Sequence, residues 1–209
     1  MIQVLQLPLG PLQTNCYVLG DQASGQAAVI DPSWDGRAIA ERVGQQGWTI
    51  SHILLTHTHF DHVGGLAELK AVCGAPIYVH PEATAMLANA PRAAMIWGIN
   101  IDEPPPPDVL LQGDETIQLG KVTLDVVYTP GHAPGHVCFH LAAEKVLFDG
   151  DVLFQGSIGR TDLPGGDYEL LMTSIREKLL PLPDETAVLS GHGPATTIGD
   201  ERRTNPFLN

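Results

Sequence analysis

Residues 51–62, SHILLTHTHFDH, join a short apolar run directly to a dense set of ligand-type side chains. The apolar run at 53–55 is bounded by polar residues, which is typical of a buried strand. Three imidazoles and one carboxylate then follow within six residues, and both groups are ligands suited to Zn, Fe or Mn. The sequence therefore predicts a transition-metal site at the end of a buried strand.

The spacing inside this motif indicates that its ligands point in two directions. His57 and His59 are two residues apart, so in an extended segment both side chains lie on one face. Asp61 and His62 come just before Gly64-Gly65, where the chain can turn into a helix and redirect its side chains. Two pairs of ligands aimed in different directions predict two metal ions rather than one. Histidines that only cap a strand end are a poor alternative, because buried imidazoles without partners are costly.

Length and composition predict one globular domain over residues 1–209. With 44% hydrophobic and 17% charged residues, the chain is too apolar to be disordered. Its 24 acidic and 11 basic side chains give a formal net charge of −13. No cluster of Lys or Arg exists beyond Arg202-Arg203, so nucleic acid is not an expected partner.

The cysteines and the N-terminus predict a cytoplasmic protein. Cys16, Cys73 and Cys138 lie far apart without a CxxC pair, so we interpret them as small apolar fillers rather than disulfide or zinc-binding residues. The first 20 residues contain neither a basic region nor a long apolar stretch, so no signal peptide is expected. No window reaches the roughly 20 apolar residues that a membrane span needs.

Apolar runs alternate with helical patterns along the chain. The segment 98–113 contains four consecutive prolines and is predicted to be a surface loop, because proline removes backbone donors. The stretch 95–98, MIWG, is expected in the core, with the wall of a pocket as the weaker alternative. Helices are predicted at 35–46, 64–73, about 82–89 and 167–180, and strands at 2–7, 14–20, 26–31, 51–57, 76–80, 115–120, 121–131, 136–143, 145–154 and 186–191.

Three further ligand-type side chains lie at the ends of apolar strands. His132 lies in the turn 129–136, TPGHAPGH, whose Gly and Pro residues hold a side chain rigidly. Asp151 follows the apolar run of KVLFDGD, and His192 lies in SGHG after TAVL. Strand ends are where α/β proteins tend to place their chemistry. Together with HxHxDH, these residues complete a set of seven.

THTHFDH, GHAPGH, the Asp151 segment and GHG together resemble the motifs of the metallo-β-lactamase superfamily. The resemblance covers nearly the whole chain, from Gly10-Pro11 to GHG. It implies an α/β fold, the αββα sandwich, with two mixed sheets flanked by helices and a metal site at one edge. It also implies two divalent ions, for which Zn is the leading candidate and Fe or Mn are alternatives. The first ion would be held by His57, His59 and His132, the second by Asp61, His62 and His192, and Asp151 would bridge them.

Flanking segments are similar to those of the short glyoxalase II-like hydrolases. Residues 157–162, SIGRTD, and 205–208, NPFL, carry this similarity. The chain differs from full-length glyoxalase II because the sequence ends at Asn209, without the C-terminal helical domain that supplies basic glutathione contacts there. The similarity implies hydrolysis of a small glutathione-derived thioester, with S-lactoylglutathione giving lactate and glutathione.

The residues are compatible with that chemistry. Two dications that share a water lower its pKa from 15.7 toward 7. Asp61 is expected to orient the resulting hydroxide, and Asp61 and Asp151 are therefore the expected catalytic carboxylates. A thiolate leaves without a strong general acid, because the pKa of a thiol is only about 8.5.

Three other interpretations remain open. A mononuclear-iron glutathione persulfide dioxygenase has the same fold, although such proteins use fewer of the seven ligands. A lactonase or β-lactamase is a further alternative, but a secreted β-lactamase would need a signal peptide. A metal-stabilised binding module is disfavoured, because structural zinc sites are closed by four ligands.

Residues beside the motifs have more specific interpretations. Arg160 is a candidate for binding a substrate carboxylate, with an ion pair to Asp162 or Asp167 as the alternative. His136 is expected near the site without being a ligand. Asp149 is expected to be structural or to accept a hydrogen bond from the ring N–H of a ligand imidazole. The remaining histidines, expected to be structural, are His52, His80 and His140.

Overall fold

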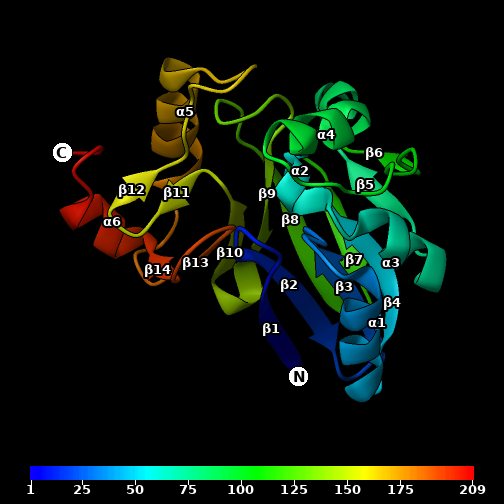
Figure 1. Ribbon diagram of the computed structural model, residues 1–209. Coiled ribbons are helices and arrows are strands. Elements are labelled where there is room, and N and C mark those ends of the chain that lie inside the picture. Colours follow the sequence, from blue (N-terminus) through cyan, green and yellow to red (C-terminus); the bar gives the residue numbers. More distant parts are fainter.

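Two six-stranded sheets stack against each other in the computed structural model, which describes residues 1–209 (Figure 1). The first sheet has the order β1-β2-β3-β4-β5-β6. Its first three strands are antiparallel and the rest run parallel to β3. The strands are β1 (Ile2–Leu9), β2 (Thr14–Asp21), β3 (Gln26–Ile30), β4 (Thr49–Leu54), β5 (Ile77–Val79) and β6 (Val109–Leu110).

The second sheet has the order β14-β13-β10-β9-β8-β7 and is also mixed. Only β10 and β13 pair in parallel, and every other pair is antiparallel. A separate hairpin, β11 (Leu153–Phe154) and β12 (Ser157–Ile158), follows β10. The strands are β7 (Thr116–Leu119), β8 (Val122–Tyr128), β9 (Val137–Leu141), β10 (Val146–Gly150), β13 (Ala187–Ser190) and β14 (Thr196–Thr197).

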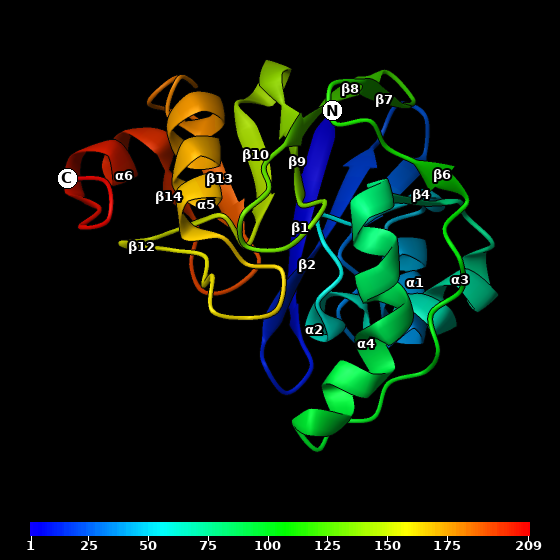
Figure 2. The ribbon, with the colours of Figure 1, turned by 90° about the horizontal axis from the view of Figure 1, so that it is seen from above.

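Helices cover the outer face of each sheet (Figure 2). The helices on the first sheet are α1 (Gly36–Gln45), α3 (Leu66–Cys73) and α4 (Thr84–Ile96). Those on the second sheet are α5 (Tyr168–Ser174) and α6 (Ile198–Thr204). The helix α5 continues as a π-helical segment, Ile175–Leu179. The four-residue helix α2 (Phe60–Val63) follows β4, and two 3₁₀ turns cover Pro81–Ala83 and Ala142–Glu144. These layers confirm the predicted αββα sandwich.

Three apolar clusters hold the layers together. The middle cluster lies between the sheets and includes Leu54 of the first sheet and Phe139 and Phe148 of the second. The outer clusters join each sheet to its helices, with Ile39 of α1 in one and Leu171 of α5 in the other. Along the inner strands such as β2, β3, β9 and β10, apolar side chains therefore alternate between two buried faces, as a sandwich requires.

The structure corrects the predicted strand over 145–154. The strand β10 stops at Gly150, whose φ of +57° lies in the left-handed region, and the chain resumes as β11 at Leu153. A residue with positive φ ends the regular alternation of side chains, and glycine adopts it without steric cost. Asp151 consequently lies in a tight turn, and Asp149 does not share its direction.

Other departures concern helices and the proline loop. The helix α4 extends to Ile96, beyond the expected end near residue 89, although Pro91 lies inside it. The sequence gives no clear signal for α6, which buries Ile198 and Glu201. The loop from 98 is irregular as predicted, but Val109–Leu110 pairs with β5 as an edge strand.

The cysteines are unpaired, and Cys16 and Cys138 are buried in the outer clusters. Cys73 is half-buried at the end of α3. No helix combines the length and the apolar character needed to span a bilayer.

Candidate metal centre

The seven ligand-type residues gather at one edge of the sandwich, where several strands end. β4 is followed by the segment that carries His57 and His59, and the short helix α2 then supplies two more side chains. The other three follow β8, β10 and β13 of the second sheet. Both halves of the chain therefore contribute to one site, whose members are His57, His59, Asp61, His62, His132, Asp151 and His192.

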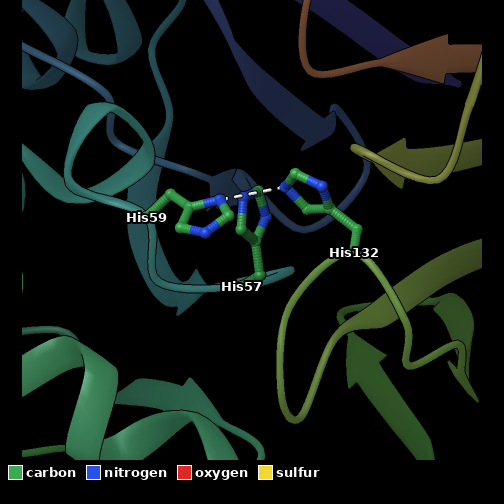
Figure 3. A group of neighbouring side chains, drawn as sticks. All are labelled: His57, His59 and His132. Atoms are coloured by element: carbon green, nitrogen blue, oxygen red, sulfur yellow. Dashed lines mark hydrogen bonds between the residues drawn. The ribbon is translucent and has the colours of Figure 1, made fainter. Parts of the chain in front are cut away.

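Three imidazoles form the first cluster, His57, His59 and His132 (Figure 3). The Nδ1 atom of His59 lies 2.9 Å from the Nε2 atom of His132. The ring of His57 is 4.8 Å from that of His59 and 4.9 Å from that of His132, between centroids, and nearly perpendicular to both. One nitrogen of each ring thus faces a common point, which is the arrangement that a tetrahedral metal ion needs.

Asp61, His62 and His192 form the second cluster. The Oδ2 atom of Asp61 lies 3.1 Å from Nε2 of His192 and 3.8 Å from Nε2 of His62. The Thr14 hydroxyl donates to the same carboxylate oxygen over 3.0 Å. The short helix α2 turns Asp61 and His62 away from the direction of His59, as the motif predicts.

Asp151 lies between the clusters. Its Oδ2 atom is 3.6 Å from Nε2 of His132 in the first cluster and 3.6 Å from Nε2 of His192 in the second. Its Oδ1 atom is 3.5 Å from Nε2 of His62. A single carboxylate therefore contacts both groups of imidazoles, which is the position of a bridging ligand.

Unpartnered buried atoms show that this set fits metal ions. Four buried side-chain nitrogen or oxygen atoms have no hydrogen-bond partner, and three of them are His57 Nε2, His62 Nε2 and Asp151 Oδ1. A buried polar atom without a partner is costly, and the cost disappears if the atom binds a cation. The donor set of imidazole and carboxylate suits Zn, Fe and Mn.

In three of the five ligand imidazoles, the other ring nitrogen has a protein partner. His62 Nδ1 donates to Asp31 Oδ2 over 3.0 Å, and His132 Nδ1 donates to the Arg160 carbonyl over 2.8 Å. His57 Nδ1 lies 3.1 Å from the Thr56 hydroxyl. These contacts fix the ring orientations and leave the opposite nitrogen free for a metal ion.

Asp31 is a functional residue that the sequence interpretation missed. Its carboxylate accepts from His62 and also from the backbone N–H and the hydroxyl of Thr56, over 2.8 and 2.6 Å. The available signal was an acidic residue at the end of β3, directly before Pro32 and beside the strand that carries the motif.

His136 and Asp149 lie beside the centre with their polar atoms already engaged. His136 Nδ1 contacts the Thr129 hydroxyl, and its Nε2 accepts from the backbone N–H of Asp151. Asp149 accepts from the Leu153 N–H and contacts Cys138, so it supports the turn and not a ligand imidazole.

The loop that carries His192 is held by strand β2. The side chains of Asn15 and Tyr17 both donate to the Ser190 carbonyl, over 3.0 and 2.7 Å. Gly191 is required there, because a Cβ atom at this position would lie 2.2 Å from Asp151 Oδ1. Close contact between this loop and the bridging carboxylate thus depends on a residue without a side chain.

The two clusters differ in charge. Burial lowers the pKa of His57 well below its ordinary value and that of His59 to about 3, so the first cluster is neutral at pH 7. Burial also acts on His62, but the carboxylates of Asp151 and Asp61 outweigh it and raise the pKa of His62 well above its ordinary value. Burial alone would raise the pKa of Asp61, yet the charge of His62 brings it to about 2.

A cavity of about 1270 Å³ opens onto the centre, and its lining includes His59, Asp61, His132, Asp151 and His192. One wall comes from α4 and the other from the β11–β12 hairpin and the loop before α5. Figure 2 shows α4 and this loop on opposite sides of α2. The lining is mostly apolar.

The expectation that Met95–Gly98 lies in the core is wrong. Met95, Ile96 and Trp97 are 66%, 82% and 57% exposed, and Ile96 and Trp97 line the cavity. The Trp97 ring lies 6.4 Å from that of Phe60, between centroids. The continuation of α4 past Pro91 carries this apolar stretch beyond the sheet and beside the metal centre.

Arg160 also lines the cavity, but its guanidinium is engaged. Its Nε and Nη2 atoms donate to the two carboxylate oxygens of Asp162 over 2.7 and 2.8 Å. This is the ion pair considered as the alternative to substrate binding. His52, His80 and His140 lie outside both clusters and contact Ser51, Glu82 and Asp125.

The amino-acid sequence of the chain is similar to the sequences of known proteins. A family model described as the metallo-beta-lactamase superfamily matches residues 9–192. The chain is 44% identical over 206 residues to the probable metallo-hydrolase YqgX of Bacillus subtilis, covering 98% of this chain and 96% of that protein. It is 42% identical over 205 residues to the hydroxyacylglutathione hydrolase GloC of Haemophilus influenzae, covering 97% and 96%.

Several solved structures are also similar to this chain in fold and sequence. BLEG-1 B3 metallo-beta-lactamase superposes with a TM-score of 0.93 at 44% identity, covering 99% of this chain and 100% of that one. TTHA1623 in a di-iron-bound form has a TM-score of 0.90 at 42% identity, covering 98% and 100%. ETHE1 from Myxococcus xanthus has a TM-score of 0.82 at 27% identity, covering 99% and 84%. In fold, motif and sequence, the chain belongs to the metallo-β-lactamase superfamily.

Proposed function

We propose that this protein is a dinuclear metallohydrolase of thioesters, with S-lactoylglutathione as the leading substrate. The observation that carries the proposal is the position of Asp151 within reach of both clusters. When bound, two divalent ions supply a nucleophile by lowering the pKa of water and stabilise negative charge on a substrate carbonyl. Zn is the leading candidate, and Fe or Mn are alternatives.

The residues of the chain have distinct parts in this reaction. The imidazoles of the two clusters and Asp151 hold the ions. Asp61 is ionised at neutral pH because its pKa is about 2, so its carboxylate can accept a hydrogen bond from the attacking water and orient it. Attack on the thioester carbonyl breaks the carbon–sulfur bond, and the thiolate leaves without a general acid because the pKa of a thiol is low.

Two relatives support different parts of the proposal. GloC is named a hydroxyacylglutathione hydrolase, which favours a glutathione thioester. TTHA1623 is described with two iron ions, which favours a dinuclear centre. A substrate-binding role for Arg160 stays a prediction, and it requires that a substrate carboxylate compete with Asp162.

The second candidate is an iron-dependent persulfide dioxygenase. The observation in its favour is the similarity to ETHE1, a persulfide dioxygenase, over 99% of this chain. Hydrolysis requires no redox change, whereas oxygen activation requires a metal that changes oxidation state, which zinc does not. The two candidate activities therefore differ in whether zinc supports them and in whether they require oxygen.

The test uses one purified preparation loaded with zinc or with iron. Zinc-loaded protein without oxygen should hydrolyse S-lactoylglutathione, and His57→Ala should abolish the activity. His140→Ala, which removes a histidine outside both clusters, should retain it. Oxygen uptake by iron-loaded protein with glutathione persulfide, without thioester hydrolysis in any metal form, would overturn the proposal in favour of the dioxygenase.

A further inference from the structure

Outside the metal centre, the cavity contains three charged side chains, Glu82, Arg92 and Arg160. Glu82 accepts from the Tyr128 hydroxyl over 2.5 Å. Arg160 forms its two-pronged ion pair with Asp162. Arg92 is exposed at the cavity and has neither an ion pair nor a side-chain hydrogen bond with the protein. The cavity therefore contains one charged group that is free to meet a charge on a substrate.

The position of Arg92 is set by α4. Asn89, Arg92 and Ile96 recur at spacings of three and four residues, so they lie on one side of the helix, and all three line the cavity. The contact between Trp97 and Phe60 holds the end of this helix beside the metal centre. Arg92 is thus presented by a fixed element, whereas Arg160 lies in a loop.

The wall that carries Arg92 is mainly apolar. Met86, Ala93 and Ile96 of α4 and the adjacent Trp97 line the cavity with it. Arg92 itself is exposed, so its guanidinium can bind a carboxylate through two N–H groups. A solvated surface cation is the alternative interpretation of Arg92, and it predicts no dependence on the charge of the ligand.

We propose that Arg92 binds a carboxylate on the thiol arm of the substrate and selects thioesters of carboxylate-bearing thiols over neutral ones. This inference rests on the proposed thioester hydrolysis and names the substrate class of that site. The arm lies along the apolar wall of α4, with the thioester at the metal centre and the carboxylate at Arg92. Arg92 is a specificity residue and takes no part in the chemical step.

A measurement of ligand affinity tests the role of Arg92 without requiring hydrolysis. The zinc-loaded protein is titrated calorimetrically with S-methylglutathione, a thioether that cannot be hydrolysed, and with N-acetyl-S-methylcysteamine, which has no carboxylate. Arg92→Met should weaken binding of the glutathione thioether about fivefold, the upper end for an exposed ion pair, and leave the neutral compound within about twofold. Arg92→Lys should restore part of the loss. Arg176→Met, on the π-helical segment, is the matched control outside the cavity.

Three results would overturn the inference: an unchanged Kd for S-methylglutathione in Arg92→Met, an equal loss for the neutral compound, or a larger loss in Arg160→Met. Its failure is distinguishable from failure of the proposed function. If wild-type protein hydrolyses neither S-lactoylglutathione nor the lactoyl thioester of N-acetylcysteamine, the function is wrong, while the Kd values still decide whether Arg92 binds a carboxylate.

Discussion

The two ligand clusters differ in chemistry although they share Asp151. The first consists of three imidazoles, with the pKa of each lowered mainly by burial. In the second, carboxylates raise the pKa of His62 and His192 although burial opposes this. The first cluster is thus neutral before a metal binds, whereas His62 of the second holds a proton that a metal must displace. Because of this difference, a metal ion at the second cluster would compete with a proton, whereas one at the first cluster would not.

Asp151→Ala should have the largest effect, because it removes the one side chain that contacts both clusters. We expect the metal content to fall from two ions per chain and the hydrolytic rate to fall by far more than the roughly 10- to 100-fold typical of an outer-shell change. Elemental analysis and the thioester assay measure both effects. Asp149→Asn, two residues away on β10, is the control and should retain two ions. Two ions and normal activity in Asp151→Ala would contradict the bridging role.

Removal of the second cluster alone should leave one ion. We expect the Asp61→Ala/His192→Ala double variant to bind one metal ion per chain, because the three imidazoles of the first cluster are intact. Elemental analysis of wild type and variant in parallel provides the count. If both preparations contain one ion, the protein is mononuclear and the comparison between the clusters fails.

Loss of the contact between Asp31 and His62 should weaken metal binding at the second cluster more than at the first. Asp31→Asn removes the charge that holds His62, so we expect about a 10- to 100-fold loss of affinity for one of the two ions. Competition with a chelating dye gives the two affinities. Asp35→Asn is a matched control, since both aspartates have positive φ, 50° and 47°, and asparagine tolerates that backbone. An equal loss for both ions would show that Asp31 supports the whole centre.

Metal affinity should depend on pH in the second cluster only. The pKa of His62 is raised, so the metal-free protein carries a proton there at pH 7, and binding must release it. Apparent affinity for the second ion should therefore rise about tenfold per pH unit until His62 loses its proton. Calorimetry in two buffers of different ionisation enthalpy counts the protons. The Asp61→Ala/His192→Ala variant should release fewer, and equal release would remove the distinction between the clusters.

Some parts of this centre could be predicted from sequence because they are local. HxHxDH places four ligands on one short segment, and a period of two followed by a helix fixes their directions. His132, Asp151 and His192 each follow an apolar strand, and the family resemblance completes the set. The fold follows from the same alternation of strands and helices.

Other parts depend on contacts between distant segments. Asp31 reaches His62 across 31 residues, and its place at a strand end before Pro32 does not show which side chain it supports. The exposed end of α4 was predicted in the core because a consecutive apolar stretch is usually buried, and only the tertiary structure shows that this stretch lies at the cavity. Whether an arginine is free or paired, as with Arg92 and Arg160, is decided by neighbours in space.

The contact of Asn15 and Tyr17 with the Ser190 carbonyl has a consequence for biosynthesis. The first cluster has all its members once His132 has been made, whereas the second needs His192, which is 60 residues later and is held by strand β2 from the opposite end of the chain. At about 5–20 residues per second, translation of that interval takes roughly 3–12 seconds. The imidazoles of the first cluster are therefore synthesised before the second cluster is complete, in an order set by the sequence.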